Sequence, residues 1–65
     1  MLNINGAKYF FIPGFTITEL INYLGFNKNV IVIDYNGIIL DKNLWEHTFL
    51  QTDDKLEILS IAGGG

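Results

Sequence analysis

Residues 2–12 contain two stretches in which hydrophobic and polar residues alternate, and two turn residues separate them. The segment reads LNINGAKYFFI, and Asn5-Gly6 suits a two-residue type I′ hairpin turn because both residue types tolerate positive φ. One face of this hairpin is predicted to be the core side and carries Leu2, Ile4, Tyr9 and Phe11. Phe10 and Ile12 then fall on the opposite face, and Pro13-Gly14 is predicted to end the second strand.

A helical period follows in residues 15–26, FTITELINYLGF. Thr16 and Glu19 have the spacing of a capping box, in which each side chain accepts a hydrogen bond from the other residue's backbone N–H. The apolar residues recur at i, i+3, i+4 and i+7, which is one face of a helix, and they are Ile17, Leu20, Ile21 and Leu24. Phe15 and Leu20 are placed for a hydrophobic staple, and Gly25 is predicted to be the left-handed C-terminal residue.

The second half of the chain predicts two strands around another Asn-Gly turn. Residues 30–33 are a β-branched run that is typical of a central strand, and Asn36-Gly37 separates it from a short strand at 38–40. The polar segment 41–47 reads as a turn or 3₁₀ segment that carries Leu44 and Trp45 inward. Residues 48–50 add a little strand at most.

A turn at residues 52–55 leads into the last predicted strand, KLEILSIA. The side chains of Asp53 and Asp54 are able to cap backbone N–H groups there. Alternation places Leu56 and Ile58 on the core face of this strand, and Glu57, Leu59 and Ile61 on the other.

This order predicts an α+β roll, in which a mixed sheet of four or five strands packs on one helix. The 65 residues make one domain, residues 1–62, followed by a flexible tail, residues 63–65. The chain has no Cys, which excludes disulfides and thiolate metal sites, and its single His makes no metal-ligand set. Stability therefore has to come from apolar burial.

The net charge and hydropathy of the chain limit the kinds of partner that it is expected to bind. The net charge is −3, and the four basic residues are all Lys, which argues against nucleic-acid binding. No apolar run reaches the roughly 18 residues that a membrane span needs. We expect a cytoplasmic protein, or one of the plastid stroma if the gene is organellar.

No residue pattern in this chain indicates an enzyme. His47 stands alone in a polar segment, where a solvated His is the common case. Asp53 and Asp54 are adjacent, so their side chains diverge, and a turn explains them better than a catalytic pair. Trp45 is interpreted as a core residue, and neither a metal nor a bound cofactor is predicted.

Three glycines, Gly63, Gly64 and Gly65, end the sequence. One interpretation is a frayed chain end. The functional interpretation is that the tail is a substrate, because three residues without Cβ can enter a narrow tunnel and present an uncrowded α-carboxylate. An enzyme can adenylate that carboxylate and open it to a nucleophile.

The chain resembles the ubiquitin-like β-grasp proteins, and within them the ThiS-type sulfur carriers. The resemblance covers the whole chain and rests on the NING start, the TITELI helix, the LWEHTFL segment and the EILSIAGGG end. Three departures are Asp41-Lys42 where the family often has Pro-Arg, Asp53 where its Asp-Gly-Asp turn has Gly, and Ala62 where Val is common. Asp53 tolerates the left-handed region, so the turn can survive. The resemblance also places the last strand parallel to the first, in the middle of the sheet.

What this resemblance implies is a carrier acted on by partner enzymes. A ThiF-like enzyme would use Mg-ATP to adenylate Gly65, and sulfur from a cysteine desulfurase route would displace AMP to leave a thiocarboxylate. A ThiG-like thiazole synthase would accept that sulfur in thiamin biosynthesis. The carrier is expected to be monomeric when free. Molybdopterin synthesis, protein modification by the tail, and a binding domain with an idle tail remain as alternatives.

An apolar surface is predicted for partner docking on the sheet face opposite the helix. Its residues are Phe10, Ile12, Val32, Leu59 and Ile61. Exposed apolar patches of this kind mark interaction sites. In the alternative interpretation, Phe10 and Ile12 cover a second small core under Leu44 and Trp45.

Overall fold

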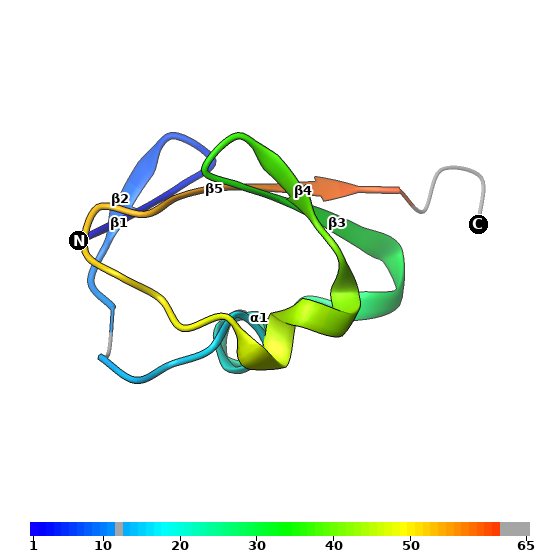
Figure 1. Ribbon diagram of the computed structural model, residues 1–65. Helices are drawn as coiled ribbons and strands as arrows, with labels where there is room; N and C mark the ends of the chain where they lie inside the picture. The colour runs from blue at the N-terminus through cyan, green and yellow to red at the C-terminus, as the bar shows by residue number, and fades with distance from the viewer. Residues whose placement is uncertain (12, 62–65) are drawn as a thin grey trace.

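A computed structural model describes residues 1–11 and 13–61 of the chain, and shows one sheet curled over one helix (Figure 1). The strands are β1 (Leu2–Ile4), β2 (Ala7–Tyr9), β3 (Ile31–Tyr35), β4 (Ile38–Leu40) and β5 (Lys55–Ser60). The helices are α1 (Ile17–Leu24) and two 3₁₀ segments, η1 (Lys28–Val30) and η2 (Lys42–His47). The sheet order is β2-β1-β5-β3-β4. The mixed five-stranded sheet on one main helix confirms the predicted α+β roll.

Both Asn-Gly pairs form the predicted hairpin turns. Asn5 and Gly6 have φ values of 51° and 85°, and Asn36 and Gly37 have 52° and 93°, which is the positive-φ pair of a type I′ turn. The first hairpin has the expected register, with Leu2 opposite Tyr9 and Ile4 opposite Ala7. β5 pairs in parallel with β1 and antiparallel with β3, which confirms its central position.

The start and end of α1 follow the sequence signals. The Thr16 hydroxyl accepts from the Glu19 N–H at 3.2 Å, and the Glu19 carboxylate accepts from the Thr16 N–H at 3.0 Å. Gly25 has φ 83° and its N–H donates to the carbonyls of Ile21 and Asn22. Ile17, Leu20 and Ile21 are buried, so the predicted apolar face of α1 lies against the sheet.

The core lies between the sheet and the layer formed by α1 and η2. Its buried apolar residues are Leu2, Ile4, Ile17, Leu20, Ile21, Ile31, Ile33, Trp45, Leu50, Leu56 and Ile58. The Trp45 indole N–H donates to the Leu40 carbonyl at 3.1 Å, so the polar atom of this core residue is satisfied. The interpretation of Trp45 as a core residue is confirmed.

Two local predictions were wrong. β2 ends at Tyr9, not at Pro13, and Tyr9 is 44% exposed because β2 is the outer strand beyond β1. Leu44 is half exposed, since neighbouring residues of a 3₁₀ segment point about 120° apart and Trp45 takes the inward direction. For residues 48–50, where a little strand at most was predicted, the structure has an isolated bridge between Thr16 and Phe49, in agreement with that expectation.

Candidate functional site

The backbone of β5 is hydrogen-bonded on its β3 side up to Ile61, two residues before the first glycine. β5 pairs with β3 through Ser60, which lies opposite Ile31, and the N–H of Ile61 donates to the Val30 carbonyl at 2.8 Å. In Figure 1, β5 crosses the middle of the sheet and points away from the N-terminus. Gly63, Gly64 and Gly65, the predicted carrier tail, lie outside the described residues. The predicted boundary between residues 62 and 63 also falls there.

The side chain of Asn5 extends the pairing of β5 on its other side. β1 stops pairing at Ile4, opposite Leu56, and the Asn5 N–H then donates to the Leu56 carbonyl at 2.9 Å. The Asn5 Oδ1 accepts from the Ile58 N–H at 2.7 Å, and its Nδ2 donates to the Ile58 carbonyl at 3.4 Å. The amide thus bonds to both backbone groups of Ile58, as a further strand residue would. Beyond the Asn-Gly turn, no sequence pattern indicates this contact.

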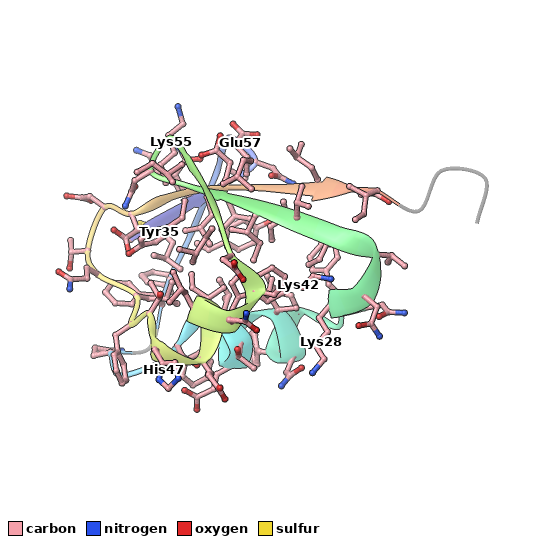
Figure 2. All side chains as sticks on the ribbon, turned by 45° about the vertical axis from the view of Figure 1, so that its right-hand side comes forward. Lys28, Tyr35, Lys42, His47, Lys55 and Glu57 are labelled. Carbon is pink, nitrogen blue, oxygen red and sulfur yellow. The ribbon has the colours of Figure 1, made fainter. Side chains whose placement is uncertain are left out.

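An apolar surface covers part of the sheet face away from α1. Figure 2 shows Lys55 and Glu57 pointing away from α1, and alternation along β5 puts Leu59 on the same face. Val32 lies opposite Leu59 in β3, and the next position on this face along the chain is Ile61. Leu59 is 46% and Ile61 56% exposed.

Ile39 joins this surface from β4, where it pairs with Asp34, two residues after Val32. It is 60% exposed, and it was not predicted from sequence because the pairing partner of a three-residue strand cannot be read from its own pattern. We call Val32, Ile39, Leu59 and Ile61 the exit patch, since Leu59 and Ile61 belong to the segment by which the chain leaves the sheet.

Phe10 does not belong to the exit patch. It is 89% exposed and lies at a hollow of about 170 Å³ between α1 and the end of β2. β2 ends at Tyr9, so the strand alternation that placed Phe10 on the open face does not reach it. The hollow is lined by Ile4, Tyr9, Phe10, Phe11, Phe15, Leu20, Tyr23 and Leu24. Ile12 lies outside the described residues.

The two adjacent carboxylates form a turn, as predicted. Asp53 has φ 67°, which is the left-handed conformation that its position requires. Asp54 is buried and accepts from the Tyr35 hydroxyl at 2.5 Å, from the Gln51 N–H at 2.8 Å and from Asn36 Nδ2 at 3.1 Å. With its oxygens engaged in this way, Asp54 ties the 51–54 turn to the β3–β4 hairpin.

Among the described residues, Tyr35 has a pKa that is clearly shifted from its ordinary value. Burial, followed by the hydrogen bond to Asp54 and the charge of that carboxylate, raises the pKa of Tyr35 to about 12. His47 lies on the surface, with Nε2 3.6 Å from a Glu46 carboxylate oxygen, and both side chains are well exposed. Such a pair contributes little to stability and forms no enclosed site.

Neither a metal centre nor a membrane span is found in the described part of the chain. Within residues 1–11 and 13–61, no three His, Asp or Glu side chains gather as ligands would. In the same residues, every helix is too short or too polar to cross a bilayer. What these residues do form is a hydrogen-bonded strand end with an apolar surface beside it, and in the sequence Ala62 and three glycines follow.

Fold and site together define a small β-grasp protein whose central strand leads into three glycines. The chain matches the ThiS family over residues 3–65. Its fold is similar to that of the crystal structure of the thiamine biosynthesis protein ThiS from Geobacter metallireducens, with a TM-score of 0.79 and 25% identity over 98% of this chain and 97% of that one. The protein belongs to the ThiS family.

Two kinds of relative accompany this match. An uncharacterized protein, ycf40, from Trieres chinensis is 39% identical over 95% of this chain and 85% of its own length. A thiazole synthase from Paramagnetospirillum magneticum is 31% identical over 98% of this chain, and the match takes up 20% of that protein. A whole ThiS-like segment is therefore part of that longer thiazole synthase chain.

Proposed function

We propose that this protein is a sulfur carrier for thiazole formation in thiamin biosynthesis, and that Gly65 is the residue that carries the sulfur. The observation that carries the proposal is the family match, which spans the β-grasp fold and continues through all three glycines to Gly65. The chain supplies a shape and a carboxylate, and partner enzymes supply the catalysis.

The chemistry at Gly65 takes two steps. A ThiF-like enzyme with Mg-ATP joins the α-carboxylate to AMP and releases pyrophosphate. A sulfide equivalent from a cysteine desulfurase route then attacks the acyl carbon, AMP leaves, and a thiocarboxylate remains. Gly63 and Gly64 allow close approach because they carry no side chains. The chain contains no Cys whose thiolate would compete for the activated carbonyl.

A ThiG-like thiazole synthase is the proposed sulfur acceptor. The support comes from the thiazole synthase of Paramagnetospirillum magneticum, whose chain contains a segment that matches 98% of this one. Two activities joined in one chain are held at high effective concentration, which suits a carrier and its acceptor. We expect the free carrier to be a monomer. Its predicted compartment is the cytoplasm, or the plastid stroma if the gene is organellar.

The exit patch is the proposed docking surface for these enzymes. Its apolar side chains come from three adjacent strands, and Leu59 and Ile61 lie directly before the tail. An enzyme that covers this patch therefore has the start of the tail within its contact area. Apolar side chains that become fully desolvated are the usual source of binding energy at such contacts.

Exchange of labelled pyrophosphate into ATP tests the first step. With a ThiF-like enzyme, the full chain is expected to support rapid exchange, and a chain that lacks Gly65 is expected to support little. The shortened chain still ends in an α-carboxylate, so it controls for the presence of any C-terminal acid. Equal exchange with both chains would contradict the assignment of Gly65.

A further inference from the structure

The hydrogen bonds from the Asn5 side chain to β5 suggest a role for this residue beyond its turn. Every turn of this type needs two residues with positive φ, and Gly serves that purpose as well as Asn. Asn5 does more, because its amide bonds to the N–H and the carbonyl of Ile58, 53 residues later in the chain. Ile58 lies only three residues before Ile61, the last described residue ahead of the tail.

The two sides of β5 are supported unequally. On the β3 side, pairing continues through Ser60, and the Ile61 N–H adds a bond to Val30. On the β1 side, strand pairing stops at Leu56. Among residues 1–11 and 13–61, the last hydrogen bonds that reach β5 from the first hairpin are those of the Asn5 amide. Without them, the end of β5 is held from one side only.

We propose that Asn5 is a positioning residue that fixes the direction in which β5 delivers the tail. This inference rests on the proposed function, because the tail matters only if Gly65 has to reach an active site. Adenylation requires the carboxylate to meet the α-phosphate in the right geometry, and a small misplacement far from the chemistry can cost up to about 100-fold in rate. Asn5 does not touch the reacting atoms and acts through the backbone of β5.

The test compares two matched variants. Asn5→Gly keeps a backbone that tolerates φ 51° and removes the amide. Asn36→Gly is the control, because Asn36 occupies the same turn position in the β3–β4 hairpin. Its amide also binds the β5 region, accepting from the Lys55 N–H at 2.8 Å and donating to Asp54 at 3.1 Å, at the end of β5 remote from the tail.

Steady-state adenylation by a ThiF-like enzyme is measured for both variants at a temperature where both are folded. For Asn5→Gly we expect kcat to fall about tenfold with KM little changed, because the docking surface is intact and the tail is misdirected. Asn36→Gly is expected to leave both constants near the parent values. Asn5→Asp keeps an acceptor for the Ile58 N–H and is expected to fall in between.

A second measurement needs no enzyme. Amide hydrogen exchange and residual dipolar couplings are recorded by NMR for residues 58–61. Asn5→Gly is expected to speed exchange at Ile58 and to change the couplings of Leu59, Ser60 and Ile61, and Asn36→Gly is not. Identical kinetics and identical NMR results for the two variants would overturn the proposal. A parent chain that no ThiF-like enzyme adenylates would instead refute the proposed function, and the NMR comparison would still decide whether Asn5 directs β5.

Discussion

At the scale of single residues, three non-glycine positions in the described part of the chain adopt positive φ, namely Asn5, Asn36 and Asp53. The first two could be predicted, because an Asn-Gly pair between alternating segments has few other uses. The long-range bonds of their side chains could not, since nothing local distinguishes an Asn that serves only its turn from one that also binds a distant strand. The same holds for Asp54, whose partner Tyr35 lies 19 residues away.

The contact between Tyr35 and Asp54 predicts a loss of stability at alkaline pH. The pKa of Tyr35 is raised from 10.0 to about 12, so the folded protein keeps this proton after the unfolded chain has lost it. Its contribution is therefore fully present below pH 10 and declines as the pH rises toward about 12. In urea unfolding across that range, Tyr35→Phe is expected to show a smaller decline than the parent chain.

The matched control is Tyr23→Phe, which changes the same chemical group on a side chain that is 75% exposed. Its decline in stability should match that of the parent. If Tyr35→Phe and Tyr23→Phe lose stability in parallel between pH 10 and pH 12, the assigned role of the Tyr35 hydroxyl is wrong.

At the scale of elements, the helix ends were predicted from sequence more accurately than the strand ends. Capping signals and hydrophobic periodicity located α1, whereas no comparable signal located the end of β2. The ends of α1 follow from Thr16, Glu19 and Gly25, because each satisfies backbone groups within one turn. The end of β2 did not follow from sequence, since the apolar run 9–12 reads as a continuing strand, whereas pairing with β1 ends where Tyr9 lies opposite Leu2. The prediction for Leu44 was wrong because neighbouring residues of a 3₁₀ segment point about 120° apart, so Leu44 and Trp45 do not both face the core.

The capping box of α1 makes a prediction about stability. Thr16→Ala removes the acceptor of the Glu19 N–H, and the free energy of unfolding is expected to fall by about 1 kcal/mol in chemical denaturation. Asn22→Ala, at an exposed interior position of the same helix, is expected to be neutral or slightly stabilising because Ala has the higher helix propensity. A Thr16→Ala protein as stable as the parent would show that the cap is dispensable.

At the scale of the whole molecule, the order of elements and their apolar faces predicted a sheet over one helix. They did not determine that β5 inserts between β1 and β3, because a strand pattern does not name its neighbours. That placement came from the resemblance to the ThiS family, which the fold confirms. In this central position β5 is bonded to β1 and Asn5 on one side as far as Ile58, and to the β3 side as far as Ile61.

The exit patch predicts a difference between two apolar-to-charged substitutions. Leu59→Lys places a charge in the middle of the patch, and kcat/KM for adenylation is expected to fall about tenfold or more. Phe10→Lys makes the same change of charge at a side chain that is 89% exposed and lies away from the patch, and it is expected to have little effect. Equal activity of the two folded variants would show that docking uses another surface.

The proposed function requires Gly65 to become a thiocarboxylate. Because the chain has no Cys, a thiol-alkylating reagent can detect that thiocarboxylate directly. The chain is incubated with a ThiF-like enzyme, ATP and sulfide, and then treated with a thiol-alkylating reagent. The adduct is located by intact mass and by mapping the C-terminal peptide, because oxidation of Met1 adds nearly the same mass as replacing oxygen by sulfur. We expect one adduct, on Gly65. An unmodified chain, from an enzyme shown to be active on an established carrier, would contradict this expectation.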